Sequence, residues 1–341
     1  MIAFGVVMGV CGVARADLYS SDQPASQTSG EGTVVGAPHP TDPGPAAPAL
    51  SPDDARHALV LAIVAAVALL SLWHTRTLDE SRLSKRTDNL SAPPLLFLAS
   101  ALAAWSAWQV GGSLYAARLD ASPAPATRDA TLLILSAYSL ALIALLALLI
   151  LAKPLSTHLG LRPRARDLLI APASLTIALP VVFLSTLLAR FLASYLAARN
   201  NTPPPDNLAH NALQELFDPA TPHNLWWWLT IASITLIAPL FEEFVYRAFL
   251  QTSIIRLTRS ILPSSSTTKR LGPVWLAISL TSAIFALAHL GAAPWYALPG
   301  LFLFGLSLGL VYERTGRLAP SILMHAGFNA INLLLASYIS T

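Results

Sequence analysis

The sequence predicts an all-α fold, a polytopic membrane helix bundle of about eight transmembrane helices that follow a signal-like N-terminal segment. Hydrophobic residues make up 54% of the 341 residues, charged residues only 11%, and the mean hydropathy is +0.58. Soluble domains carry about 25% charged residues. The apolar residues are also gathered into long segments, as expected of a chain that crosses a bilayer repeatedly.

Each predicted transmembrane helix is an apolar segment, and crossing the hydrocarbon core takes about 20 residues. The predicted spans are residues 58–73, 93–115, 131–152, 168–198, 225–249, 274–290, 295–312 and 318–339. The fourth span is longer than a perpendicular crossing needs, and Pro172 and Pro180 are expected to kink it.

The N-terminal region predicts two segments that add no span. Residues 1–16 resemble a secretory signal peptide, because a short apolar stretch ends in Ala14-Arg15-Ala16. An uncleaved anchor or a mis-assigned start is the alternative. Residues 17–56 are rich in Pro, Ser, Gly, Thr and Ala, which predicts a disordered external segment. Cys11 is the only cysteine, so intramolecular disulfides and thiolate zinc clusters are excluded.

The loops between the predicted spans differ in positive charge. Fourteen Lys and Arg residues lie within residues 74–92, 153–167, 256–273 and 313–317, against four in the alternate loops, Arg56, Arg118, Arg128 and Arg199. Cytoplasmic loops are enriched in Lys and Arg, so the first set is predicted to be cytoplasmic. The N-terminal segment, the 200–224 loop and the C-terminus are then external. A net charge of +3 is too small to indicate nucleic-acid binding.

Two adjacent carboxylates and an arginine interrupt the apolar segment 225–249. Charged groups at membrane depth cost about 2.5–3.5 kcal/mol each on insertion scales, so chains retain them mostly for function. On a helix, Glu243 and Arg247 are four residues apart and share a face, with the acid in the favourable N-terminal position. Glu242 points about 100° away from Glu243. We therefore expect a structural Glu243–Arg247 pair and a Glu242 that is available for chemistry.

Three further polar side chains, His289, His325 and Asn329, lie inside the last predicted spans. His325 and Asn329 are four residues apart and therefore share a helical face. A single intramembrane histidine is often a structural hydrogen-bonding group. Two histidines, an asparagine and two glutamates together favour a functional site, because each needs a partner in the bilayer.

Three motifs resemble those of a known family: Glu242-Glu-Phe-Val-Tyr-Arg247, Phe285-x-x-x-His289 and His325-x-x-x-Asn329. Their order, spacing and flanking residues resemble the CPBP family, which comprises the type II CAAX prenyl endopeptidases and bacterial relatives linked to bacteriocin immunity. The resemblance covers residues 226–332. Ala248 departs from it, because relatives often have Gly there, and we expect this to affect helix packing and not catalysis.

The resemblance implies an intramembrane endopeptidase whose catalytic transmembrane core is residues 225–341. Residues 57–199 are then N-terminal transmembrane helices, and residues 200–224 are an external loop. The implied partners are a membrane-embedded or lipid-anchored protein or peptide substrate and the lipid bilayer, with no nucleic acid. The signal-like start and short loops indicate the bacterial cytoplasmic (inner) membrane.

Peptide hydrolysis needs a water molecule, a base that activates it and donors for the oxyanion. Glu242 is the candidate base. His289 is a candidate to hold the same water or to act as a general acid. Asn329 and His325 can donate to the tetrahedral intermediate, where one donor is typically worth about 2.7–4 kcal/mol.

A metalloprotease site is the alternative chemistry, with zinc held by Glu242, His289 and His325. Asn is a poor zinc ligand, and the sequence has no His-Glu-x-x-His pair, so we favour a metal-free mechanism and leave zinc as the alternative.

The positions of Glu242 and His289 along their predicted spans place the two residues at different depths in the membrane. The site closes only if spans are offset, tilted or interrupted, for which Pro239, Gly291 and Pro294 are candidates.

Two other functions compete with a protease. A non-catalytic scaffold or bacteriocin-immunity factor would use the same polar cavity for binding, and a transporter would use its charges as a proton relay. The complete motif set favours an enzyme over the scaffold. The charges gather in the last four spans with no matching set in the first four, which disfavours an inverted-repeat transporter.

Overall fold

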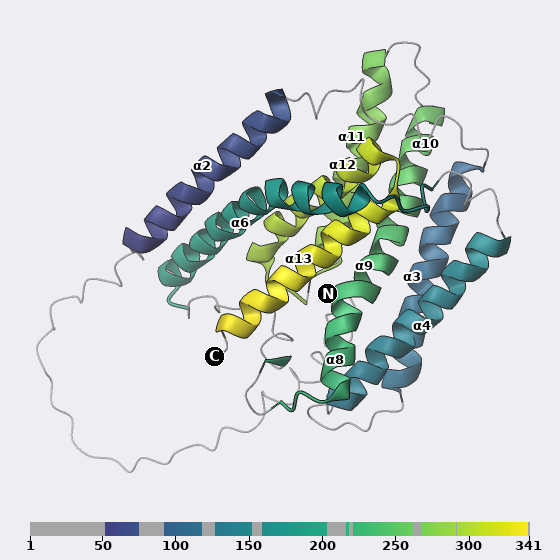
Figure 1. The fold of residues 1–341 in the computed structure, drawn as a ribbon, viewed down its shortest axis with the longest axis horizontal. Helices are drawn as coiled ribbons and strands as arrows, with labels where there is room; N and C mark the ends of the chain where they lie inside the picture. The colour runs from purple at the N-terminus through teal and green to yellow at the C-terminus, as the bar shows by residue number, and fades with distance from the viewer. Residues whose placement is uncertain are drawn as a thin grey trace, which may run out of the picture.

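The computed structural model describes residues 52–74, 92–117, 127–151, 159–202, 216–217, 221–261, 267–290 and 292–339. Every regular element within these ranges is a helix (Figure 1), which confirms the predicted all-α class. The predicted signal peptide lies outside the described residues. So does most of the predicted disordered segment 17–56, although the first described helix already begins at Pro52, inside it.

The helices follow the predicted spans closely. They are α2 (Pro52–His74), α3 (Pro94–Ala116), α4 (Thr127–Leu151), α6 (Asp167–Arg199), α8 (Leu225–Ala232), η3 (Ser233–Ile237), α9 (Ala238–Glu243), η4 (Phe244–Gln251), α10 (Thr252–Ile261), α11 (Thr267–Leu287), η5 (Trp295–Ala297), α12 (Leu298–Thr315) and α13 (Leu318–Ile339).

Six membrane spans are long and apolar enough among the described residues: 94–116, 128–151, 167–199, 225–261, 295–315 and 318–338. The apolar parts of α2 and α11 are shorter, at Ala58–Leu72 and Gly272–Leu287. All eight predicted spans are therefore helical, and six of them meet the length of a full crossing.

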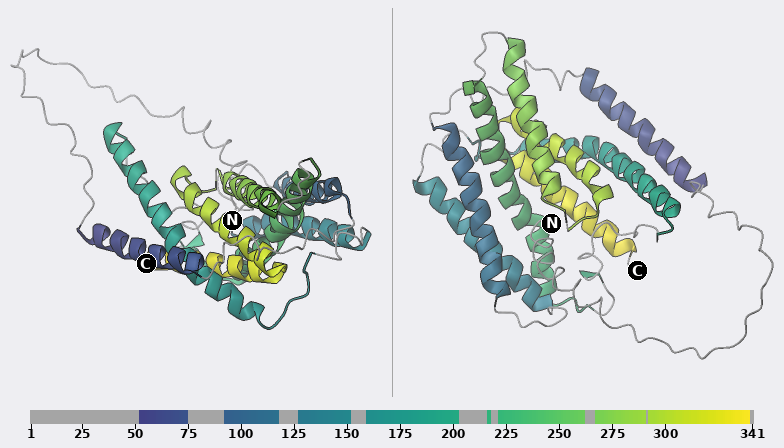
Figure 2. Two further views of the ribbon diagram at one scale, coloured as in Figure 1. Left: turned by 90° about the horizontal axis from the view of Figure 1, so that it is seen from above. Right: turned by 180° about the vertical axis from the view of Figure 1, so that it is seen from behind.

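The helices form a series of neighbours across the molecule. α3 and α4 pack together at one edge, and the long helix from α8 to α10 lies beside them (Figure 1). α11, α12 and α13 come next, and α6 packs on α12 and α13 and carries α2 on its other side. Figure 2 shows the same order from behind. The N-terminal helices therefore flank the helices that carry the motifs on both sides.

The surface of the bundle is apolar. Large hydrophobic side chains with high exposed fractions include Leu151 at 84%, Leu169 at 75% and Leu334 at 69%. Apolar surface of this extent is typical of contact with lipid. The buried residues include a group of charged and polar side chains from the three motifs, which is the reverse of the usual arrangement in a soluble protein.

The helix that carries the first motif is longer than predicted. It is helical over all 37 residues Leu225–Ile261, whereas the prediction ended it at residue 249. At 1.5 Å per residue this is about 55 Å, well above the ~30 Å hydrocarbon core. Its last part, Thr252–Ile261, carries Arg256 and Arg259 on one face. The apolar segment ends before these charges, so hydropathy placed the end of the helix too early. Glu242 and Glu243 consequently lie at the midpoint of the helix and not near its end.

Two π-helical segments, η3 and η4, interrupt this long helix on either side of the adjacent glutamates. Such segments are rare and are often found at functional sites. Pro239 was a candidate for an interruption of this helix, but the helix continues through it. It follows η3, where the backbone N–H of Ala238 bonds the carbonyl oxygen of Ser233 five residues earlier.

The α11 helix ends at Leu287, three residues before the predicted end. The chain then turns tightly, with the backbone N–H groups of His289 and Leu290 bonding the carbonyl oxygens of Ala286 and Leu287. Pro294 then caps the next helical turn, η5, in an extended conformation. His289 therefore sits in a turn after the helix and not within it.

Candidate active site

The two neighbouring glutamates are both almost completely buried, at 1% and 0% exposure for Glu242 and Glu243. The predicted pairing is present, because Glu243 Oε2 lies 3.4 Å from Nε of Arg247. Neither carboxyl oxygen of Glu242 has a hydrogen-bond partner within the described residues. A buried carboxyl group without partners is costly, so it calls for an explanation other than stability.

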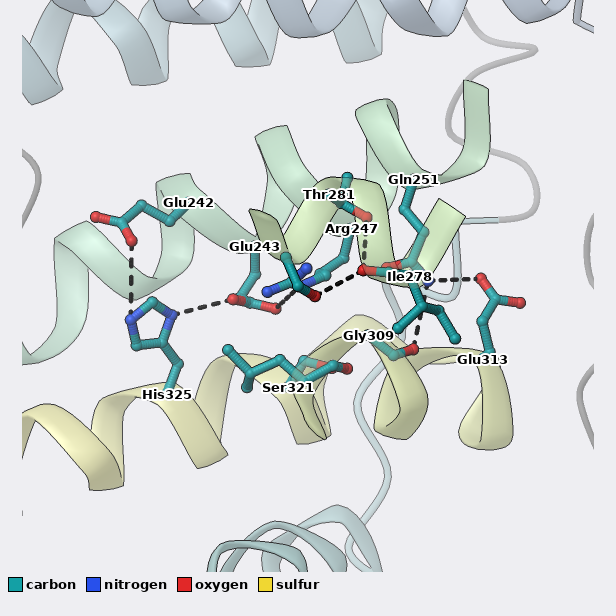
Figure 3. A network of polar contacts seen from close by, with 12 residues as sticks. Glu242, Glu243, Arg247, Gln251, Ile278, Thr281, Gly309, Glu313, Ser321 and His325 are labelled. Carbon is teal, nitrogen blue, oxygen red and sulfur yellow. Dashed lines mark hydrogen bonds and ion pairs between the residues drawn. The ribbon is translucent and has the colours of Figure 1, made fainter. Parts of the chain in front are cut away.

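His325 contacts both glutamates, one with each ring nitrogen (Figure 3). Its Nδ1 lies 3.0 Å from Glu243 Oε1, which is hydrogen-bond distance, and its Nε2 lies 3.8 Å from Glu242 Oε2. The ring is itself buried, with 2% of its residue exposed. The sequence predicted that the two glutamates point in different directions, and α13 brings one side chain between them.

Arg247 is the largest of the fully buried side chains. Its guanidinium carbon lies 5.6 Å from the ring centroid of Phe285, which favours the cation. None of its three side-chain nitrogens has a hydrogen-bond partner among the described residues, and its contact with Glu243 is an ion pair at 3.4 Å.

Phe285 joins the second motif to the other two. Its ring packs against His289 at 4.7 Å, against Tyr246 at 5.4 Å and against His325 at 5.7 Å between ring centroids. His289 is 1% exposed, and its Nδ1 lies 2.7 Å from the carbonyl oxygen of Phe285. His289 and His325 therefore lie on one aromatic ring, which brings the second motif next to the third.

Asn329 is tied to the π-helical segment η3. Its amide nitrogen donates to the carbonyl oxygen of Ile234 at 2.9 Å. In the π register that carbonyl would accept from Pro239, which has no N–H, so the Asn329 amide supplies the missing donor. The side-chain oxygen of Asn329 has no partner among the described residues. Asn329 therefore has a structural role at η3, beside the oxyanion role predicted from the sequence.

A second polar layer lies two helical turns beyond Glu243, and it was not predicted from the sequence. The amide nitrogen of Gln251 donates to Glu313 Oε1 at 3.0 Å and to the carbonyl oxygen of Gly309 at 3.3 Å (Figure 3). A Cβ at Gly309 would lie 2.8 Å from Gln251 Oε1, so glycine permits the close approach of α12. Glu243, Arg247 and Gln251 recur every four residues, and this spacing was the available signal.

The predicted zinc ligands do not fit a zinc site in this arrangement. Zinc is usually held by at least three protein donors at about 2.0–2.3 Å. In the part of the chain that the structure describes, no group of three or more His, Cys, Asp or Glu side chains could hold a metal ion. Nδ1 of His325 is engaged by Glu243, and Nδ1 of His289 lies 2.7 Å from the carbonyl oxygen of Phe285.

Residues 224–331 match a family model described as type II CAAX prenyl endopeptidase Rce1-like. This match confirms the resemblance drawn from the three motifs, all of which lie within it. No curated protein and no solved structure matches the chain. The apolar helices and the match together support a multi-pass membrane protein that resembles the CAAX-type proteases over residues 224–331.

Proposed function

From the Rce1-like match over residues 224–331, we propose that the protein is an intramembrane endopeptidase that cleaves a peptide bond of a membrane-embedded or lipid-anchored substrate. The observation that carries this proposal is the position of His325 between two buried carboxylates, one of which, Glu242, has no other partner among the described residues. A buried carboxylate without a hydrogen bond destabilises a fold, so a scaffold would gain nothing from keeping it.

The charges of the buried cluster favour one proton shared between His325 and Glu242. Glu242 and Glu243 carry two negative charges and Arg247 carries one positive charge, so the cluster is neutral when His325 is protonated. Burying a net charge is costly, which favours a neutral cluster in which either His325 or Glu242 holds one proton. With that proton on His325, Glu242 is an ionised base, and His325 donates one N–H to Glu243 while the other is directed at Glu242.

Hydrolysis follows from this arrangement. Glu242 takes a proton from a water molecule as the water oxygen bonds to the scissile carbonyl carbon. The N–H of His325 that faced Glu242, released once Glu242 is protonated, and the second amide N–H of Asn329 stabilise the oxyanion that forms. The carbon–nitrogen bond then breaks as the proton held by Glu242 passes to the leaving nitrogen, either directly or through His289. The products are a carboxylic acid and an amine, and the cluster regains its starting charge.

The test compares membrane fractions of cells that carry the intact protein, Glu242→Gln or no protein. New peptide N-termini that appear only with the intact protein would be identified by mass spectrometry, and a peptide spanning that site would be the substrate for assays with purified protein. We expect the intact protein alone to cleave it. If Glu242→Gln produces the same termini at the same rate, the protein does not use Glu242 as its base.

We also propose that the basic loops face the cytoplasm of a bacterial cell and that the N-terminal segment is external. Cysteines introduced singly at Ser29 and Ser265, in a chain that carries Cys11→Ser, would be treated with a membrane-impermeant thiol reagent in intact cells. We expect only the cysteine at position 29 to react. Reaction at position 265 alone would reverse the orientation.

A further inference from the structure

A second buried ion pair lies outside the matched motifs and joins the two halves of the chain. Asp167 begins α6 and Arg317 lies between α12 and α13, 150 residues apart. They are only 1% and 6% exposed. Asp167 Oδ1 accepts from Nε of Arg317 at 2.8 Å and also from a second guanidinium nitrogen. Its Oδ2 accepts from the backbone N–H of Arg164 at 2.9 Å.

The chain segments on either side of this ion pair also form hydrogen bonds with each other. The carbonyl oxygen of Gly160 accepts from the N–H of Leu318 at 3.1 Å, and the Tyr312 hydroxyl donates to the carbonyl oxygen of Leu159 at 3.2 Å. Gly160 has a φ of +67°, and a Cβ there would clash with the carbonyl oxygen of Gly316. Residues 159–167 are therefore fitted to the turn that precedes α13.

The same turn determines where α13 begins, and α13 carries His325. His325 follows Arg317 by eight residues, which is about 12 Å along a helix. Displacement of α13 by one residue would rotate His325 by about 100°. Because His325 must lie within 3.0 Å of Glu243 and 3.8 Å of Glu242, small movements of α13 would break the contacts of the site.

We propose that Asp167 and Arg317 are positioning residues of the active site, which fix the axial position and the rotation of α13 so that His325 meets both glutamates. The effect on turnover rests on the proposed endopeptidase function, while the effect on His325 does not. The catalytic unit then begins at residue 159, well before the matched region 224–331, and α6 is part of it.

The test uses the full-length protein with Asp167→Asn and Arg317→Lys, which keep the size of each side chain but weaken the pair. Thr131→Val is the matched control. It removes a buried hydroxyl that lies 2.7 Å from that of Thr230, so it disturbs helix packing between α4 and α8 without touching α13. Thermal melts in detergent would select conditions under which all variants are folded.

Two readouts are needed. The first is the rate at which diethyl pyrocarbonate modifies His325, measured by mass spectrometry, because this needs no substrate. We expect faster modification in Asp167→Asn and Arg317→Lys than in the wild type or the control. The second is turnover of the peptide substrate, where misplacement of a catalytic group by about 1 Å lowers kcat by about 10²-fold. We expect that fall with KM little changed.

The outcomes separate the two proposals. Faster modification of His325 in the variants, when the wild type itself shows no detectable cleavage, would support the positioning role and contradict the endopeptidase. Wild-type modification rates and kcat in both folded variants would overturn the positioning role. If neither variant folds, Tyr312→Phe decides, because it removes one hydrogen bond of the same contact. It should speed modification modestly, and an unchanged rate would count against the proposal.

Discussion

The two buried ion pairs of this protein, Glu243–Arg247 and Asp167–Arg317, differ in how well their atoms are satisfied. Both oxygens of Asp167 accept hydrogen bonds, and Arg317 donates from more than one nitrogen. Arg247 makes only an ion pair at 3.4 Å, without a hydrogen bond in the described residues. Glu242, beside it, has no hydrogen-bond partner for either oxygen in the same residues.

The difference indicates what each pair is for. A buried ion pair stabilises a fold only when its remaining hydrogen-bonding atoms are satisfied, because desolvation otherwise exceeds the attraction. The Asp167–Arg317 pair meets that condition and joins two chain segments. The cluster around Glu242 leaves hydrogen-bonding atoms unsatisfied among the described residues. Such atoms are available to bind a reactant or to transfer a proton. Four variants and one chelation experiment test this difference.

The largest effect is expected for Glu242→Gln. The substitution keeps the shape of the side chain and removes the base, so turnover should fall by about 10²–10⁴-fold. Stability should change little, because no hydrogen bond of Glu242 is lost among the described residues. A cleavage assay and a thermal melt on the same preparation measure both. A folded Glu242→Gln protein that cleaves at the wild-type rate would show that the roles in this site are wrongly assigned.

The opposite result is expected for Glu243→Gln and Arg247→Ala. Each leaves one buried charge without its partner, which typically destabilises a protein by about 3–5 kcal/mol. Both should lower the melting temperature and the yield in detergent, whereas Glu242→Gln should not. Denaturation of the three variants in the same detergent makes the comparison. Equal stability of all three would mean that the pair does not hold the first motif in place.

Asn329→Ala should have an intermediate effect. It leaves the carbonyl oxygen of Ile234 without its donor, which costs about 1–3 kcal/mol in stability. If Asn329 also donates to the oxyanion, kcat should fall by about 10²–10³-fold at a temperature where the variant is folded. A stability loss with unchanged kcat would limit Asn329 to its contact with η3.

The smallest effect is expected from metal removal. Strong chelators should leave turnover unchanged, and the purified protein should hold no stoichiometric zinc, because its candidate ligands do not converge as three donors among the described residues. Metal analysis before and after chelation, together with the cleavage assay, measures this. Loss of activity on chelation and its return with zinc would make Glu242, His289 and His325 ligands.

Several features of the site could be predicted because they are local. Glu243 and Arg247 are four residues apart on one helix, so their contact follows from helix geometry alone. The burial of His325 and Asn329 on one face of α13 follows in the same way. The end of the long helix could not be found from hydropathy, because Thr252–Ile261 is helical but not apolar throughout.

The contacts between helices required the tertiary structure. His325 and Glu243 are 82 residues apart, Asn329 and Ile234 are 95 apart, and Asp167 and Arg317 are 150 apart. Their meeting depends on how α6, α9 and α13 pack, which no sequence spacing encodes. Glu313 and Gln251 were missed for the same reason, since each is an ordinary polar residue until the other helix brings its partner.

The all-α membrane class, the apolar helices and the three motifs could be predicted from the sequence, because apolar length and short-range spacing act within single helices. Packing between helices determines which carboxylate has no hydrogen-bond partner among the described residues, which histidine reaches both glutamates and which segment contacts the start of α13. These depend on the depth and rotation of whole helices, which buried contacts between distant residues determine.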